Sequence, residues 1–385
     1  MKPFAARLRF AGIVAAMLAT VVLCARAQDP PAARPGSKAS GDAVLRIYQE
    51  AIERIRSKGL LTGPFDPEAV RAAGTLKSYL HENDPYGDFL TPEEYARFQK
   101  LRSEQYAGVG LELERGRDGK VYCFPDADGP SAAAGVVAGD RLLEVEGQPV
   151  GGLALPTLAA MAAGNPGSML NLEVSGRGHG TRHVSVARRR ASGPSVVRTK
   201  VGPRTVLRVA AFSPATRQEL DFLVSTAPSS DPLILDLRRN RGGDLNAAID
   251  CAMLFLDRGQ AVLTVRAKDG TRSYFGSGMR PAWPRRVILW QDSGTASAAE
   301  VFIAALTENG RGVSMGEKTF GKGTRQEVFE LESGAALILT TGYLVTPHGR
   351  EIDKLGLKPT YPVSEAGPGD AAYLQRLEQL LASPS

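Results

Sequence analysis

The sequence has few of the residues that build metal sites and disulfide frameworks. It contains three cysteines and four histidines in 385 residues. Outside an apolar N-terminal segment only Cys123 and Cys251 remain, and two cysteines are not a framework, so we expect two separately buried thiols. The histidines are scattered, and no pair has the spacing of metal ligands. The sequence therefore gives no sign of a metal site.

Long apolar runs are also lacking. The run at residues 10–24 has 15 residues, whereas a membrane span needs roughly 20. Three basic residues precede this run and the small-residue pattern Ala-Arg-Ala follows it, which predicts a secretory signal peptide at residues 1–27. Residues 28–41 would then form a flexible linker. We expect an exported, periplasmic protein without a membrane span after cleavage; a retained signal anchor is the alternative.

Acidic residues are absent from this N-terminal segment, and that absence accounts for most of the basic charge. The whole chain carries a formal net charge of +6, but four basic residues lie in residues 1–27, so the remainder carries +2. Three consecutive arginines at residues 188–190 are typical of a solvated linker. We therefore expect no nucleic-acid partner.

The first part of the chain after residue 41 changes its pattern near residue 105. Residues 42–104 place apolar and charged positions at helical spacing, and Thr91 followed by proline is typical of a helix start. Residues 105–190 change to short strands separated by glycine turns, with a hairpin predicted around residues 118–119. We therefore expect a small helical N-terminal segment followed by a β-rich domain.

Part of this β-rich domain has a recognisable pattern. The segment GPSAAAGVVAGDRLLEVEG at residues 129–147 resembles a PDZ domain, and residues 155–163 would be the second helix of that domain. PDZ domains bind extended peptides by adding a strand to a sheet edge, often holding a terminal carboxylate with backbone amides. A PDZ-shaped module that only packs against its neighbour is the alternative. The resemblance assigns the peptide-binding amides to Gly108, Val109, Gly110 and Leu111.

Strand and helix patterns alternate through residues 191–365. TVLRVAAF precedes the helical ATRQELDFLVSTA, PLILDL precedes LNAAIDCAMLFL, and RRVILWQD precedes ASAAEVFIAALTENG. This alternation predicts an α/β core, a mixed sheet with helices, and residues 366–385 end the chain as an amphipathic helix. The expected fold is this core plus a PDZ domain and the helical N-terminal segment.

Two motifs near residue 316 suggest chemistry but lack its context. GEKTFGKG at residues 316–323 approaches a phosphate-binding P-loop, yet Gly323 stands where a magnesium-binding Ser or Thr is needed, and strand formers follow instead of a helix. GVSMG at residues 312–316 fits the G-x-S-x-G pattern of a nucleophile elbow, yet no helix follows Ser314. We therefore expect no nucleotide site here and place Ser314 in a strand.

Ser297 has the surroundings that Ser314 lacks. It follows the predicted strand VILWQD and the turn SGTA, and it opens the helical AAEVFIAALTENG. A hydroxyl there lies at the C-terminal end of a strand, where the positive end of the helix favours an alkoxide. An ordinary N-cap serine is the alternative, and local spacing alone favours it.

The string SGTASAAEVFIAALTENGRGVSMGEKTFGKGTRQ at residues 293–326 closely resembles the C-terminal processing peptidases, also called tail-specific proteases. In that family the nucleophile is the serine of A-S-A-[SA]-E, the general base is the lysine of T-F-G-K-G, and a later glutamine supports the lysine. Those positions are Ser297, Lys322 and Gln326, and the family's separation of 25 residues between serine and lysine is kept. Further blocks match in order at residues 84–90, 233–244, 340–352 and 356–363. Ala299 and Thr360 depart from the family pattern, which often has serine and aspartate there.

The residues around this pair suit its chemistry. A lysine acts as a base only when neutral, and burial can bring its pKa down from a reference value of about 10.4. Phe320, between small and flexible neighbours, would supply apolar bulk, and Gln326 can accept a hydrogen bond from the amine without adding negative charge. The oxyanion of the tetrahedral intermediate would accept a hydrogen bond from the backbone N–H of Ala298. A second N–H would come from the Gly242-Gly243 turn, and the sequence does not decide which of the two glycines donates it.

The resemblance implies a serine endopeptidase that needs no metal or cofactor. Its PDZ domain would recognise the apolar C-terminal tails of exported or unfolded polypeptides, and Ser297 would form the acyl-enzyme. Activation by an adaptor protein is compatible with this scheme. A catalytically inactive PDZ-containing scaffold that binds peptides is the alternative, and the complete serine, lysine and glutamine positions count against it.

Overall fold

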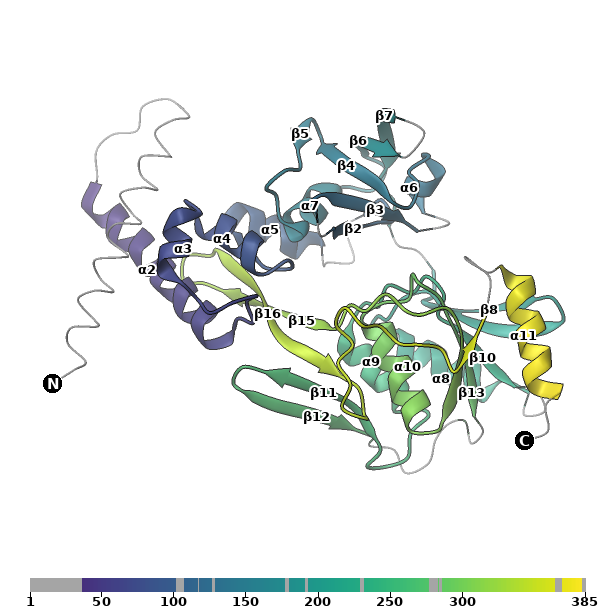
Figure 1. The fold of residues 1–385 in the computed structure, drawn as a ribbon. Coiled ribbons are helices and arrows are strands. Elements are labelled where there is room, and N and C mark those ends of the chain that lie inside the picture. The colour runs from purple at the N-terminus through teal and green to yellow at the C-terminus, as the bar shows by residue number, and fades with distance from the viewer. Residues whose placement is uncertain are drawn as a thin grey trace. The chain divides into compact units, whose positions relative to one another are not determined.

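The computed structural model describes residues 37–101, 107–116, 118–126, 129–176, 180–190, 193–228, 232–276, 283, 286–363 and 369–382. The predicted signal peptide therefore lies outside the described residues. Two compact units make up the chain, one formed by residues 1–191 and 326–341 and the other by residues 192–325 and 342–385. Figure 1 shows the elements of both units.

The second unit is built on a mixed six-stranded sheet. Its strand order is β17-β14-β13-β10-β9-β8, with β8 antiparallel to β9 and the other neighbours parallel. The predicted α/β core with a mixed sheet is confirmed. The strands are β8 (Val196–Val201), β9 (Arg204–Val209), β10 (Leu233–Asp236), β13 (Val287–Gln291), β14 (Gly312–Gly316) and β17 (Tyr361–Pro362).

Helices cover both faces of this sheet. Successive residues of a strand point to opposite faces, and in the central strands both sets are apolar. Leu233, Leu235 and Leu289 belong to the cluster that packs under α8 (Thr216–Ser225), α9 (Leu245–Ala252) and α10 (Ala298–Glu308). The intervening Ile234 and Ile288 belong to the cluster under α11 (Asp370–Ala382). Figure 1 shows α11 on the opposite side of the sheet from α9 and α10.

A second sheet joins β11 (Ala261–Ala267), β12 (Gly270–Phe275), β15 (Thr324–Glu330), β16 (Ala336–Val345) and β1 (Asp88–Leu90). In the second unit, residues 342–345 of β16 pair antiparallel with β11. In the first unit, residues 336–338 of the same strand pair antiparallel with β1.

The first unit contains the predicted N-terminal helices. They are α2 (Ser37–Lys58), α3 (Pro67–Ala72), α4 (Leu76–Asn83) and α5 (Pro92–Leu101). The start of α2 lies inside the segment predicted to be a flexible linker. Thr91 caps α5 as its sequence predicts: its hydroxyl accepts the Glu94 N–H at 3.2 Å, and its own N–H donates to the Glu94 carboxylate at 2.8 Å. Buried Ile52, Ile55 and Leu80 form the core of these helices with Leu337 and Leu339.

A small β-rich module completes the first unit. Its sheet has the order β2-β3-β4-β6-β7, with β2 at an edge and β5 paired to β4, and the predicted hairpin at residues 118–119 joins β2 to β3. Its elements are β2 (Leu111–Arg115), β3 (Val121–Pro125), α6 (Pro130–Ala133), β4 (Asp140–Val145), β5 (Gln148–Pro149), α7 (Leu155–Ala162), β6 (Met169–Gly176) and β7 (Gly180–Ala187).

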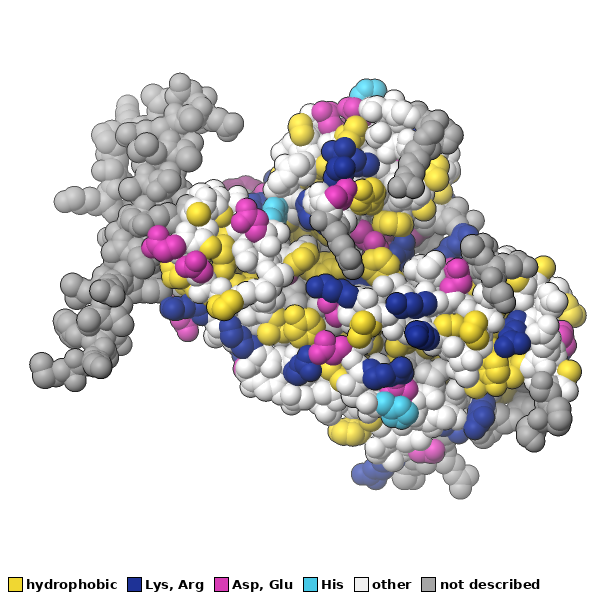
Figure 2. Space-filling model, viewed as in Figure 1, with side chains coloured by type: hydrophobic (Ala, Val, Ile, Leu, Met, Phe, Trp, Pro, Cys, Tyr) yellow, Lys and Arg dark blue, Asp and Glu magenta, His cyan; other side chains and the backbone are white. Residues whose placement is uncertain are grey.

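Both cysteines of the described chain are free and buried, as the sequence predicts. Burial raises the pKa of the Cys123 and Cys251 thiols to about 12, so both stay protonated and unreactive at neutral pH. Lysine and arginine side chains are interspersed with acidic and apolar ones on the face seen in Figure 2. Within the described residues, no helix combines the length and apolar character needed to cross a membrane.

Candidate active site

Ser297 lies at the junction between β13 and α10, where it is the N-cap of the helix. Its backbone has φ 58° and ψ −122°, a conformation that non-glycine residues rarely adopt. An ordinary N-cap residue has φ and ψ in the β region. Strain of this kind is typical of functional positions, where the surrounding structure must hold the residue in place. The backbone of Ser297 therefore departs from that of an ordinary N-cap residue, although Ser297 does cap α10, and its role as the nucleophile stays a prediction.

The helix that follows Ser297 is rigidly held. Nine consecutive residues of α10, from Ala298 to Leu306, are buried, and Phe302 packs against the rings of Phe212 and Phe255. A helix buried along its length is fixed by packing on all sides. Its first N–H groups have no acceptor within the helix. The Ala299 N–H donates to the Ala296 carbonyl at 3.2 Å and the Glu300 N–H to the Ser297 carbonyl at 2.9 Å, so the Ala298 N–H is the candidate donor at this end of the helix.

Glu300 connects the Ser297 junction to the loop that carries Lys322. Its side chain is fully buried, and its Oε2 accepts the backbone N–H of Ser297 at 2.8 Å and that of Lys322 at 2.9 Å. Its Oε1 accepts the Thr319 hydroxyl at 2.5 Å and the Gly321 N–H at 2.8 Å. One carboxylate oxygen therefore holds the backbone of both predicted catalytic residues.

All four partners of Glu300 are arranged as donors, which suits an ionised carboxylate. Burial nevertheless raises the pKa of this carboxyl, and the hydrogen bonds act in the opposite direction. In the sequence Glu300 stands out only as the last residue of the motif that contains Ser297. The available signal was the S-x-x-E pattern of a capping box, which Ser297 and Glu300 satisfy.

The loop between β14 and β15 brings Lys322 to Glu300. A Cβ at Gly323 would lie 2.0 Å from the backbone nitrogen of Asp353, and Gly321 has φ 92°, so both positions require glycine. The Phe320 N–H donates to the Thr295 carbonyl at 2.9 Å, two residues before Ser297. Phe320 itself is 39% exposed. Strand β15 follows this loop, as the sequence predicts, whereas a P-loop would be followed by a helix.

A tight turn after β10 packs directly on Ser297. A Cβ at Gly242 would lie 2.9 Å from both Ser297 Cβ and the Ala298 nitrogen, so only glycine fits there. The buried Asn240 side chain accepts the Gly242 N–H at 2.8 Å, and the Asn240 carbonyl accepts the Ala296 N–H at 2.9 Å. Because the Gly242 N–H is already donated, the Gly243 N–H is the turn's remaining candidate for an oxyanion.

Gln326 belongs to the first unit, and its predicted role beside Lys322 stays a prediction. In that unit its Nε2 lies 3.4 Å from Thr340 Oγ1, which in turn donates to Asp84 Oδ1 at 2.8 Å. Asp84 is buried, and burial raises its pKa. The amide nitrogen of Gln326 is thereby turned towards the DPYGDFL loop.

The predicted peptide-binding amides at residues 108–111 lead into the edge strand β2, whose first residue is Leu111. The Gly108 N–H donates to the Arg189 carbonyl at 3.2 Å and so belongs to the backbone pairing of the module. Gly110 has φ 59°, a left-handed turn that leads into β2. Val109, Gly110 and Leu111 are therefore the members of the predicted set whose amides are candidates for a bound peptide.

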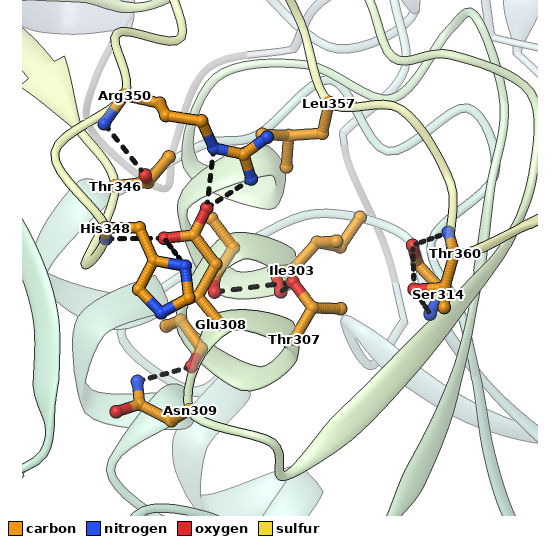
Figure 3. A network of polar contacts seen from close by, with 12 residues as sticks. Ile303, Thr307, Glu308, Asn309, Ser314, Thr346, His348, Arg350, Leu357 and Thr360 are labelled. Atoms are coloured by element: carbon orange, nitrogen blue, oxygen red, sulfur yellow. Dashed lines mark hydrogen bonds and ion pairs between the residues drawn. The ribbon is translucent and has the colours of Figure 1, made fainter.

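Ser314 is structural, as the sequence predicts. It lies in β14, is 2% exposed, and exchanges hydrogen bonds with Thr360: the Thr360 N–H donates to Ser314 Oγ at 3.0 Å, and the Ser314 N–H donates to Thr360 Oγ1 at 3.2 Å. Figure 3 shows this pair at one side of the network around Glu308. Thr360, which departs from the family pattern, thus finds its partner in Ser314.

Comparison with known proteins agrees with this geometry. Peptidase family S41 matches residues 204–363. The carboxyl-terminal-processing protease of Picosynechococcus sp. is 34% identical over 76% of this chain and 72% of its own length. The carboxy-terminal processing protease CtpA of Bacillus subtilis is 29% identical over 84% of this chain and 70% of its own length.

A solved structure gives the same result. The photosystem II D1 C-terminal processing protease covers 88% of this chain and 97% of its own, with a TM-score of 0.68 and 25% identity. The fold and the sequence similarity therefore indicate the same family. The chain belongs to Peptidase family S41 and, within it, to the carboxyl-terminal-processing serine proteases.

Proposed function

We propose that this protein cleaves polypeptides with Ser297 as the nucleophile and Lys322 as the general base. The observation that carries the assignment is the Glu300 Oε2 atom, which accepts the backbone N–H of both residues. The strained backbone of Ser297 adds a second argument, because such conformations persist mainly where function requires them.

The reaction proceeds through an acyl-enzyme. Neutral Lys322 accepts the proton of the Ser297 hydroxyl as Oγ attacks the carbonyl carbon of the scissile bond. The resulting oxyanion accepts hydrogen bonds from the N–H groups of Ala298 and Gly243. The ammonium then protonates the leaving amine, and a water molecule, deprotonated by the same lysine, hydrolyses the ester. Gln326 supports the amine as a neutral acceptor.

The β-rich module of residues 107–190 serves as a PDZ domain that selects the substrate. The edge position of β2 supports this assignment, because an extended peptide can add as a strand beside it. The amides of residues 109–111 hold the terminal carboxylate, and an apolar tail lies along the partly buried side chains of β2. Exported or unfolded polypeptides with apolar C-termini are the proposed substrates, in the periplasm, and an adaptor would act on this module.

The test is cleavage of an unfolded reporter that ends in an apolar tail, measured from pH 6 to pH 10. Wild type is expected to cut, Ser297→Ala and Lys322→Ala to be inactive, and Ser314→Ala to keep wild-type activity as the matched serine control. A serine-directed fluorophosphonate should label wild type and Ser314→Ala but not Ser297→Ala. Activity in Ser297→Ala would overturn the assignment, and absence of both cleavage and labelling in wild type would favour the peptide-binding scaffold.

A further inference from the structure

The C-terminal helix α11 contributes a tyrosine to the edge of the sheet where the proposed active site lies. Tyr373 and Leu377 are fully buried and pack on Ile234, Ile288 and Trp290, on the face opposite α10. The sequence predicts an amphipathic helix there, without indicating a function for it. Asp370 and Tyr373, in its first turn, make their polar contacts at the C-terminal ends of β10 and β13.

The first two contacts involve β13 and β14. The Tyr373 hydroxyl donates to the carbonyl of Gln291, the last residue of β13, at 2.5 Å. A Cβ at Gly316, the last residue of β14, would lie 2.4 Å from the same hydroxyl, so this glycine makes room for the tyrosine. The Gln291 side chain in turn donates from Nε2 to the Glu317 carbonyl at 2.7 Å and to the Leu357 carbonyl at 3.0 Å.

The third contact involves β10. Arg238 follows this strand, and its guanidinium lies 4.5 Å from the centre of the Tyr373 ring and 4.8 Å from that of Trp290. It also pairs with Asp236 at 2.7 Å and with Asp370, in the first turn of α11, at 2.8 Å. These pairs raise the pKa of Arg238 above its ordinary value, so the guanidinium stays charged. Arg238 is thus fixed between the sheet and α11.

The segments that follow these three strand ends carry the proposed catalytic groups. After β10 comes the turn with Gly243, after β13 comes Ser297, and after β14 comes the loop with Lys322. A shift of about 1 Å at such groups can lower a rate by roughly 10²-fold. Core packing fixes the position of the middle of each strand. The position of each strand end also depends on the side chains that bind its backbone.

We propose that Tyr373, together with Arg238, is a positioning residue for the reaction: docking of α11 aligns the oxyanion turn, the nucleophile and the base. The inference rests on the proposed function and deepens it. Tyr373 and Arg238 act through the backbone of Gln291, Gly316 and the β10 turn rather than on the substrate. The active site therefore depends on a helix on the far side of the sheet.

Two variants test the proposal with a matched control. Tyr373→Phe keeps the ring and removes only the hydroxyl, and Asp370→Asn removes the charge that pairs with Arg238. Glu378→Gln is the control, because Glu378 also joins α11 to the sheet, through Arg204 at 2.8 Å, but away from the three strand ends. Cleavage of the apolar-tailed reporter gives kcat and KM, fluorophosphonate labelling reports the reactivity of Ser297, and thermal unfolding reports stability.

For Tyr373→Phe we expect kcat and the labelling rate to fall about tenfold with KM unchanged. For Asp370→Asn we expect a fall of about threefold, and for Glu378→Gln no change in either rate. Wild-type kcat and labelling in both α11 variants would overturn the proposal. Equal losses in the control and in the α11 variants, in step with Tm, would also overturn it in favour of plain helix packing. Failure of the proposed function is distinguishable, because either Ser297→Ala would still cleave or wild type itself would neither cleave nor be labelled.

Discussion

Helix α10 carries a buried glutamate at each end, and the two are held in different ways. Glu300, at the N-terminal end, is fully buried, and its partners are three backbone N–H groups and the buried Thr319 hydroxyl. The Glu308 side chain, at the C-terminal end, is 4% exposed; it accepts the single backbone N–H of His348 at 2.6 Å, and the side chains of its partners Arg350 and His348 are 64% and 65% exposed. Figure 3 shows Glu308 facing Arg350 and His348.

The difference teaches what each end of the helix does. Backbone N–H groups are fixed by the fold, so a carboxylate that accepts them holds several segments at defined positions with little loss of side-chain entropy. An ion pair with long, solvated side chains is weak, because the charges are screened and the side chains must be ordered. Glu300 therefore organises the proposed active site, whereas Glu308 ties the loop at residues 346–351 to the helix.

The largest expected effect in this comparison comes from Glu300→Gln. The substituted amide places an NH₂ group against donors, so at least one of the four hydrogen bonds is replaced by repulsion. We expect kcat to fall by about 10²-fold or more, because Ser297 and Lys322 lose their shared anchor. The measurement is kcat on the apolar-tailed reporter with Glu308→Gln as the control. A Glu300→Gln enzyme with more than a third of wild-type kcat contradicts the comparison.

A smaller loss is expected for Thr319→Val, which keeps the shape of the side chain and removes its hydroxyl. That hydroxyl donates to Glu300 at 2.5 Å and accepts the Leu357 N–H at 2.7 Å. We expect about 1–2 kcal/mol of lost stability and a kcat lower by about tenfold. Chemical denaturation and reporter cleavage, measured on the same preparation, separate the two effects. Unchanged kcat would mean that Thr319 supports only the fold of the loop.

Features of the fold that depend on residues close together in the sequence can be predicted from it, whereas those set by tertiary contacts cannot. The three strand–helix pairs β9–α8, β10–α9 and β13–α10 follow from apolar runs and turn residues and agree with the prediction, whereas the antiparallel pair β11–β12 between α9 and β13 was not predicted. Ser297 and Lys322 were identified by motif and spacing. The start of α2 at Ser37 was missed, because proline, glycine and serine indicate a linker in the absence of tertiary contacts.

The roles of Glu300 and Tyr373 could not be predicted in the same way. Glu300 satisfies a local capping pattern with Ser297, but its bonds to Gly321 and Lys322 join residues more than 20 positions apart. Tyr373 lies on a predicted amphipathic helix, yet the strand ends that it reaches are set by tertiary packing. Sequence periodicity specifies which face of an element is buried and not which atoms it meets.

Glu300 should also make the stability of the protein depend on pH. Burial raises the pKa of Glu300 in the folded state above its unfolded value near 4.5. A raised pKa means that the folded state binds the proton more tightly, so Glu300 contributes most stability below the unfolded pKa and loses it as the pH rises through the folded pKa. As the pH rises from the unfolded to the folded pKa of Glu300, the unfolding free energy of wild type should therefore fall relative to that of Glu300→Gln. Denaturation from pH 4 to pH 8 measures it, and a flat difference would contradict the shift.

The smallest effect is expected at the other end of α10. In wild type the backbone N–H of His348 donates to Glu308 at 2.6 Å, and in Glu308→Gln the amide oxygen can still accept it. The variant loses the ion pair with Arg350. Because both side-chain partners are largely exposed, we expect the free energy of unfolding to fall by only about 1 kcal/mol, less in high salt, and kcat to stay within about twofold of wild type. Denaturation at low and high salt, beside reporter cleavage, measures both. A loss of kcat as large as that of Glu300→Gln would show that the loop at residues 346–351 also positions the active site, and the functional contrast between the two ends of the helix would then fail.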